Sequence, residues 1–219
     1  MAIQSIASTS LERAGHGSQW HQALPELGDG VVLLRQLRRH DALWLLRHVK
    51  RSPVLQYIAQ CPSTVDGFER FIRWTHAQRR RGSHACYGIV PCNTDHAVGI
   101  IQLWWTDRKF ATAEWGFAVG EAYWGSGVAM RAAQLFLDGL FVNQIFGGPG
   151  VFRLEARAAV QNARGNAFLR KLGATREAIV PGGFRQGDRE SDCVIWSVLA
   201  AEWVQRRRAF HSRKPCLAP

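Results

Sequence analysis

The residues best placed to do chemistry lie between positions 114 and 129, where a strand pattern runs into a glycine-bearing turn and then into a helix pattern. Apolar residues alternate up to Val119, Gly125 and Gly127 stand in the turn, and helical spacing begins near Ser126. The start of a helix leaves backbone N–H groups unpaired, and its dipole favours a negative charge. Glycine also lets the backbone approach an anion closely. The segment therefore predicts a cradle for a phosphate group.

Two familiar nucleotide-binding patterns do not fit this turn. A dinucleotide-binding fold of Rossmann type needs a third glycine three residues after the second, and Met130 occupies that position. A P-loop needs Gly-Lys-Ser/Thr, which the sequence lacks. The turn is then either a different kind of phosphate site or a tight connection without a ligand.

The composition predicts one globular domain. A chain of 219 residues with 47% hydrophobic content can bury one core, and its 21% of charged residues are not typical of a disordered protein. No apolar run approaches the roughly 20 residues of a membrane span, and residues 1–10 lack the pattern of a secretory signal. The five cysteines lack metal-ligand spacing, so we expect free thiols in a reducing cytoplasm and no metal site.

The chain is strongly basic, with 28 Lys and Arg residues against 17 Asp and Glu and a net charge of +11. Arginine clusters stand at 79–81 and 206–208. Two interpretations stay open: a solvated surface with a positive tail, or attraction to an anionic partner such as a phosphate-rich cofactor, RNA, the ribosome or an acidic protein. No zinc-finger spacing or RNA-recognition aromatic motif supports sequence-specific binding of nucleic acid.

Hydrophobic periodicity predicts an α/β fold with a central sheet of six to seven strands flanked by about four helices. Three consecutive strands without intervening helices exclude a regular doubly wound sheet and favour a mixed, largely antiparallel one. We expect residues 1–29 to form an N-terminal arm or leader, 30–200 the domain, and 201–219 a basic tail. The predicted strands span 31–37, 84–90, 97–105, 112–119, 151–160, 175–181 and 192–199, the last two joined through a Pro-Gly-Gly turn, and the predicted helices span 40–51, 64–81, 126–143 and 162–172.

This order of elements, together with two motifs, resembles the GNAT superfamily of acetyl-CoA-dependent N-acetyltransferases, and within it the RimJ/RimL-like branch. The first motif runs from Glu114-Trp115-Gly116-Phe117 through Trp124-Gly125-Ser126-Gly127-Val128-Ala129, and is similar to the pyrophosphate loop of the family. The second comprises Arg153-Leu154-Glu155-Ala156, Asn162 and the ending Arg170-Lys171-Leu172-Gly173-Ala174. The resemblance covers about residues 30–200, and it implies a mixed GNAT-like sheet and acetyl-CoA as cosubstrate.

The resemblance also implies roles for individual positions. The end of the strand would pair with the pantetheine arm of the cosubstrate, and the Val119 amide would face the thioester oxygen as an oxyanion donor. Asn162 would lie near the pantetheine on the other side, where the family splays two parallel strands apart. The positions that would contact the cosubstrate are Phe117, Ala118, Val119, Trp124, Gly125, Ser126, Gly127, Val128, Ala129 and Asn162.

Three positions depart from the family pattern. Trp124 replaces the Gln or Arg that opens the loop, which removes one side-chain donor. Leu169 stands where many relatives have a tyrosine as general acid, and Gly165 stands where the branch has a serine. The proton donor for the leaving thiolate is therefore unassigned.

An amine must lose its proton before it attacks a thioester. Glu114 is the candidate general base, because the resemblance implies a base on this strand that acts through water. Strand alternation places it on the opposite face from Trp115 and Phe117. The alternative is a structural carboxylate paired with Arg153 or Arg157, and Glu155 is a second candidate. For Ser126, ordinary turn chemistry or helix capping is an alternative to ligand binding.

The resulting hypothesis is an N-acetyltransferase that transfers acetyl directly from acetyl-CoA to a primary amine. By resemblance, the acceptor is a protein N-terminus, such as that of a ribosomal protein, or a small amine. The rival hypothesis is a non-catalytic module that binds acyl-CoA or RNA on the same fold, since the usual proton donors are absent. We expect a cytoplasmic protein without membrane contact, either a monomer or a homodimer.

Overall fold

The structure is a computed structural model that describes residues 19–49, 61–106, 112–147, 150–186 and 189–212. These residues form eight strands and five α-helices. The strands are β1 (Leu27–Gly28), β2 (Val32–Gln36), β3 (His84–Pro91), β4 (Gly99–Trp105), β5 (Thr112–Val119), β6 (Arg153–Ala159), β7 (Thr175–Gln186) and β8 (Arg189–Leu199). The helices are α1 (Asp41–Val49), α2 (Val65–Arg80), α3 (Val128–Phe141), α4 (Ala163–Leu172) and α5 (Ala200–Ser212), with the short 3-10 helices η1 (Gln19–His21) and η3 (Glu121–Tyr123).

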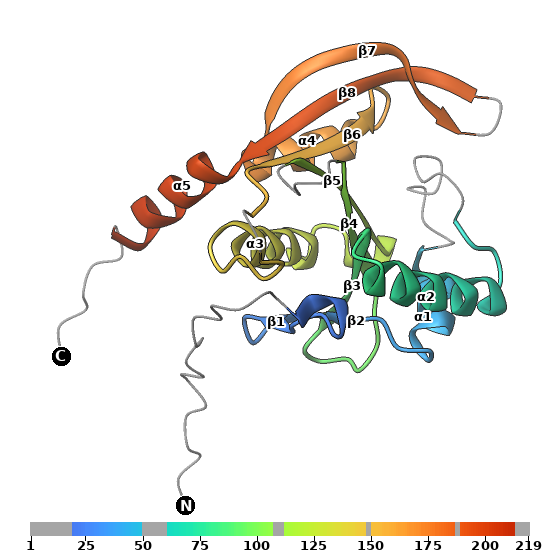
Figure 1. Ribbon diagram of the computed structural model, residues 1–219. Coiled ribbons are helices and arrows are strands. Elements are labelled where there is room, and N and C mark those ends of the chain that lie inside the picture. The colour runs from blue at the N-terminus through green and yellow to red at the C-terminus, as the bar shows by residue number, and fades with distance from the viewer. Residues whose placement is uncertain (1–18, 50–60, 107–111, 148–149, 187–188, 213–219) are drawn as a thin grey trace, which may run out of the picture.

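All eight strands belong to one sheet in the order β1-β2-β3-β4-β5-β6-β8-β7 (Figure 1). Every neighbouring pair is antiparallel except β5 and β6, which run parallel. The predicted mixed, largely antiparallel sheet is therefore confirmed. The single parallel pair lies in the middle of the sheet and joins the two motifs that the sequence singled out.

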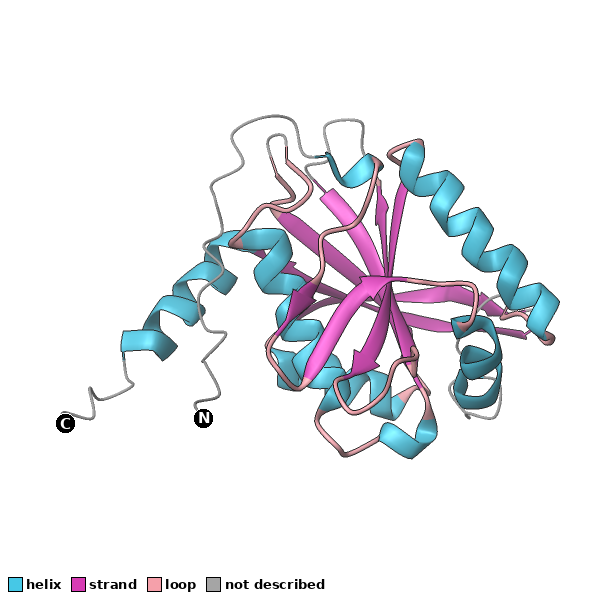
Figure 2. Ribbon diagram, turned by 90° about the horizontal axis from the view of Figure 1, so that it is seen from below, coloured by secondary structure: helices cyan, strands magenta, loops and turns pink. Residues whose placement is uncertain are grey.

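Helices cover both faces of the sheet, as Figure 2 shows from below. The larger core packs one face against α3, α4 and α5 and includes Trp115, Phe136 and Leu169. The smaller core packs the other face against α1 and α2 and includes Phe68 and Ala118. Because successive side chains of β5 point to opposite faces, Trp115 and Ala118 enter different cores.

Two helices of the α/β framework begin with the capping side chains that helices prefer. Thr64 caps α2 through its hydroxyl, which accepts a hydrogen bond from the Gly67 amide at 3.0 Å. Asn162 caps α4 in the same way, with Oδ1 accepting from the Gly165 amide at 2.9 Å. The predicted helices 64–81 and 162–172 therefore begin and end close to the expected residues, whereas residues 50 and 51 of the first predicted helix lie outside the described residues.

Both chain ends contribute more to the fold than the sequence indicated. Residues 201–212 of the predicted basic tail belong to helix α5, in which Trp203 is buried and donates its indole N–H to Asp138 of α3 at 2.8 Å. In the predicted N-terminal arm, Trp20 is buried in the larger core and β1 pairs with β2. Residues 1–18 and 213–219 of these two segments lie outside the described part of the chain.

The predicted turn between the last two strands is wrong. Pro181-Gly182-Gly183 does not reverse the chain but forms an irregularity within β7, where the register with β8 shifts between Val180 and Phe184. Gly182 adopts a φ of 61° and its amide donates to the Asp192 carboxylate at 3.1 Å. A bulge of this kind lets a long strand bend, and β7 and β8 arch across one end of the molecule (Figure 1).

Candidate active site

The parallel strands β5 and β6 pair only at their beginnings. Three residue pairs are in register, and the last of them joins Glu114 to Glu155. Beyond it, β5 keeps its pairing with β4 up to Val119, and β6 keeps its pairing with β8 up to Ala159. The two strands therefore diverge, and we call the diverging segments, residues 115–119 and 156–159, the fork.

The backbone of β5 presents polar groups to the fork. The Gly120 amide donates to the Val98 carbonyl of the β4 side at 2.9 Å. In an antiparallel pair, residues that form hydrogen bonds to the partner strand alternate with residues whose N–H and C=O groups point away from it. Phe117 and Val119 are residues of this second kind, so their amides are directed toward the fork. The Val119 carbonyl accepts the indole N–H of Trp124 at 3.0 Å, and the Val119 amide lies beyond the last β5–β6 pair, which is Glu114 with Glu155.

The loop between β5 and α3 requires its two glycines for backbone reasons. Gly125 and Gly127 have φ values of 75° and 85°, and a Cβ atom added at either position would meet no atom within 4 Å. Packing therefore does not exclude a side chain, but the left-handed conformation disfavours one. The space beside the loop is open, as a site for an anion needs.

The first turn of α3 lacks a side-chain cap at Gly127. The Ser126 hydroxyl donates to the Tyr123 carbonyl at 2.6 Å and accepts from the Val128 amide at 3.3 Å. This is the turn chemistry that formed the alternative interpretation of Ser126. The next amide in the turn, that of Ala129, belongs to the unpaired donors at the positive end of the helix.

Asn162 and its neighbours hold the other side of the fork. The Asn162 side chain is engaged in capping α4, so its acceptor is used within the protein. Sequence reasoning missed Asn166, which is buried and donates to the Ala159 carbonyl at 3.0 Å and accepts from the Trp196 indole at 2.8 Å. It ties α4 to the end of β6 and to β8. A polar residue on the apolar side of a helix was the available signal.

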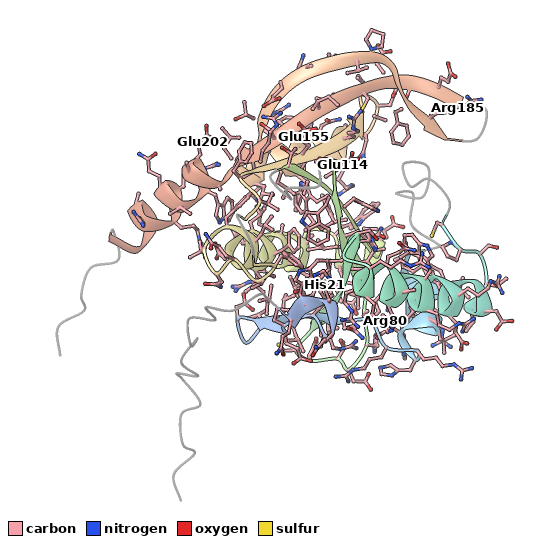
Figure 3. All side chains as sticks on the ribbon, viewed as in Figure 1. His21, Arg80, Glu114, Glu155, Arg185 and Glu202 are labelled. Carbon is pink, nitrogen blue, oxygen red and sulfur yellow. The ribbon has the colours of Figure 1, made fainter. Side chains whose placement is uncertain are left out.

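Glu114 lies beside an arginine and has a perturbed pKa. Its carboxylate lies 3.4 Å from the Arg157 guanidinium, which confirms the predicted pairing with an arginine, and its side chain is 33% exposed. Burial raises the pKa of Glu114, the Arg157 charge opposes that rise, and the nearby Glu155 adds to it. Figure 3 shows Glu114 and Glu155 together where β5 and β6 begin to diverge.

Arg153 binds two other carboxylates, those of Glu155 and Glu177. Its guanidinium lies 2.8 Å from Glu155 and forms a paired contact with Glu177 of β7, one bond of which is 2.8 Å long. Together with the Ser197 hydroxyl, Arg153 lowers the pKa of Glu177 to about 2. Glu155 and Glu177 therefore have a close cationic partner, whereas the cationic partner of Glu114 among the described residues is the more distant Arg157, and the pKa of Glu114 is raised.

An aromatic row leads from the surface to Glu114. Trp104 lies directly opposite Glu114 in the β4–β5 register, and its ring lies over Gly116, whose Cβ would be 3.6 Å away. The row continues through His84, 5.2 Å from the Trp104 ring, to Trp74, which is 45% exposed. Of the two consecutive tryptophans, only Trp104 faces this side.

Trp105 lies on the other face of the sheet, where it stacks on Trp20 with 4.5 Å between ring centroids.

The two positions at which the resembled family has a proton donor hold Leu169 and Gly165 in this chain, and neither side chain can donate a proton. Leu169 is buried in the larger core with 3% exposure. At Gly165 a Cβ atom would lie 2.5 Å from the Asn162 side-chain nitrogen, so a serine there needs the cap to move. Within the described ranges, no group of three His, Cys, Asp or Glu residues could hold a metal ion. Among the helices in those same ranges, none is long and apolar enough to cross a membrane.

The chain was compared with protein families and with solved structures. A family described as an acetyltransferase (GNAT) domain matches residues 32–175. A GNAT-family acetyltransferase structure from Bacillus anthracis has 19% identity and a TM-score of 0.69, covering 81% of this chain and 99% of its own. The ribosomal-protein-S5-alanine acetyltransferase from Vibrio fischeri has 16% identity and a TM-score of 0.69, covering 82% and 98%. No curated protein matches the sequence.

A further solved structure is that of RimL, a ribosomal-protein α-N-acetyltransferase in complex with coenzyme A. It has 15% identity and a TM-score of 0.68, and the match covers 80% of this chain and 98% of RimL. At these identities the solved structures show a shared fold. The family match itself extends over well more than half of the chain and includes the loop, the fork and α4. The chain therefore belongs to the GNAT family of acetyltransferases.

Proposed function

We propose that this protein transfers the acetyl group of acetyl-CoA directly to a primary amine, and that the amine is the N-terminus of a polypeptide. The observation that carries the proposal is the fork. It places an unpaired backbone edge of β5, the uncapped start of α3 and the half-buried Glu114 on connected segments. Family membership supports acetyl-CoA as the donor.

The described residues fit the donor in two places. The open space beside Gly125 and Gly127 and the Ala129 amide in the first turn of α3 suit a pyrophosphate. The edge of β5 at Phe117 and Val119 suits a pantetheine arm, which would add to the sheet like a further strand. When bound, acetyl-CoA supplies the activated thioester.

The Val119 amide is the proposed oxyanion donor. Its N–H group is directed toward the fork, and its own carbonyl is held by the Trp124 indole. A fixed backbone donor stabilises the charge that develops on the thioester oxygen without reorganising, and one such donor is worth about 100- to 1,000-fold in rate.

Glu114 is the proposed base, and its position implies that it acts through water. Five strand steps separate the Cα atoms of Glu114 and Val119 by about 17 Å, and three steps separate Glu114 from Phe117 by about 10 Å. A carboxylate side chain cannot bridge either distance directly. Burial raises the pKa of Glu114, which makes the carboxylate a stronger base, and the partly exposed side chain has access to water.

A polypeptide N-terminus is the acceptor that the surroundings favour. Two solved structures of the same fold belong to enzymes named for acetylating ribosomal proteins. The row from Trp74 to Trp104 offers aromatic faces, and Glu114 offers a carboxylate, which together suit an ammonium group carried by a peptide. The four described cysteines are free thiols, which supports a reducing cytoplasm as the location.

The test is an assay of CoA release from acetyl-CoA with three sets of acceptors. These are peptides with a free N-terminus, the same peptides with a blocked N-terminus and an internal lysine, and polyamines. We expect release with the first set and addition of one acetyl group to the α-amine by mass spectrometry. Release with the other sets alone rejects the proposed acceptor. Tight CoA binding with no release from any amine favours the non-catalytic module.

A further inference from the structure

The loop of this chain opens with Trp124, at the position where a cationic or amide side chain could reach a phosphate. The structure places a cation there from another element. The Arg164 guanidinium lies over the Trp124 ring, 4.1 Å from its centroid. Arg164 belongs to the first turn of α4, which lies 40 residues further along the chain.

Helix stability does not explain Arg164. It is the second residue of α4, close to the positive end of the helix dipole, where a cation is unfavourable. Among the residues that the structure describes, no carboxylate pairs with it, and its side chain is exposed. The stacking on the Trp124 ring is therefore the interaction that holds its guanidinium.

The stack orients the guanidinium beside the loop. A guanidinium that stacks through its face keeps its N–H groups at the edge free for hydrogen bonds. Trp124 directly precedes Gly125, and its indole is fixed in turn by the Val119 carbonyl at 3.0 Å. The chain of contacts from Val119 through Trp124 to Arg164 thus holds a cation next to the open space of the loop.

We propose that Arg164, clamped on the Trp124 ring, binds the pyrophosphate of coenzyme A and replaces the side chain that the loop lacks. This inference rests on the proposed function, because it assumes that the loop holds the pyrophosphate. Arginine suits the role, since its planar guanidinium can bind two phosphate oxygens at once. Trp124 acts as a positioning residue that restricts the guanidinium before the ligand arrives.

The test is calorimetric titration of the full chain with CoA. We expect Arg164→Gln to weaken CoA binding about 10- to 100-fold, as for loss of a charge-assisted hydrogen bond. Arg164→Lys keeps the charge but lacks the planar guanidinium, so its CoA affinity should lie between those of the wild type and Arg164→Gln. Arg170→Gln removes an exposed charge from the last turn of the same helix and should bind CoA like the wild type. Thermal unfolding of each variant checks that the fold is kept.

Two further measurements separate the possible outcomes. Trp124→Leu should weaken binding by a similar factor, and the double variant with Arg164→Gln should be little worse than either, because both remove one coupled unit. Dephospho-CoA, which keeps the pyrophosphate, should show the same loss for Arg164→Gln as CoA. A loss seen only with CoA rejects the pyrophosphate contact.

The failures are distinguishable. If the wild type binds CoA and Arg164→Gln binds it equally well, the role of Arg164 is refuted while the proposed function stands. If the wild type binds no CoA, the proposed function and this inference both fail.

Discussion

Replacing Gly127 by aspartate is the sharpest test of the loop as a phosphate site. Gly127 has a φ of 85°, and a Cβ atom there would meet nothing within 4 Å. The cost to folding is therefore that of the left-handed conformation alone, about 1–2 kcal/mol for an ordinary residue and less for Asp or Asn. For a chain of this size, 1–2 kcal/mol corresponds to a fall in Tm of roughly 2–8 °C.

The effect on CoA binding should be much larger. A carboxylate about 4 Å from one phosphate charge is repelled by about 4 kcal/mol at the effective dielectric constant of a protein surface. Each 1.4 kcal/mol changes an equilibrium tenfold, so the affinity should fall about 1,000-fold. Gly127→Asn is the matched control, because it imposes the same backbone and nearly the same shape without the charge.

Calorimetry with CoA and thermal unfolding together decide the question. A second control is Gly30→Asp, because Gly30 also has a positive φ, 82°, and open space around it but lies between β1 and β2. We expect Gly30→Asp to retain CoA affinity and Gly127→Asn to lose far less than Gly127→Asp. Equal losses for the Asn and Asp variants at Gly127 refute the electrostatic argument, and unchanged affinity for Gly127→Asp refutes the loop as the phosphate site.

Three further predictions concern catalysis and stability. Glu114→Gln should lower kcat/KM at least about 100-fold with unchanged CoA affinity. Arg157→Leu should move the acid limb of the pH profile of kcat/KM to higher pH, because the Arg157 charge lowers the pKa of Glu114. Full activity of Glu114→Gln, or an acid limb that does not move in Arg157→Leu, shows that Glu114 is not the base. Val119→Pro removes the amide directed toward the fork and also fixes the backbone φ near about −65°, so kcat should fall about 100-fold along with some loss of CoA affinity, and an unchanged kcat assigns the oxyanion donor elsewhere. Burial lowers the pKa of His84 to about 4, so the unfolded chain takes up its proton first as the pH falls, and between pH 6.5 and about 4 the unfolding free energy should drop by about 1.4 kcal/mol per pH unit. His84→Phe should reduce that slope in denaturant titrations, and an unaltered slope shows that other groups cause it.

The loop and the alternation of β5 could be predicted from the sequence because both depend on neighbouring residues. Side-chain direction in a strand repeats every two residues, so the face of Glu114 follows from that of Trp115. The glycines at 125 and 127 indicate a left-handed backbone without reference to the rest of the fold. The pairing of Glu114 with an arginine was foreseen as an alternative because Arg157 lies on a neighbouring strand with the same alternation.

Other features escaped prediction because their signals are weak or distributed. Residues 200–212 lack a regular apolar stripe, and the burial of α5 depends largely on Trp203 reaching Asp138. The Pro-Gly-Gly segment has the composition of a turn, yet the pairing of β7 with β8 on both sides of it makes it a bulge. Asn166 was overlooked because its partners, Ala159 and Trp196, belong to two other strands.

The sequence alone therefore determined the local chemistry: a glycine turn before a helix, a strand with Glu114 on one face, and a missing donor at Trp124. Only the tertiary structure decided what these parts do together. The fork exists because β6 follows β8 while β5 follows β4, a competition between strand pairings that no local pattern encodes. Likewise, Arg164 reaches Trp124 only because α4 packs beside the loop across 40 residues of intervening chain. Periodicity reports the direction of a side chain, whereas its partner depends on how distant elements pack.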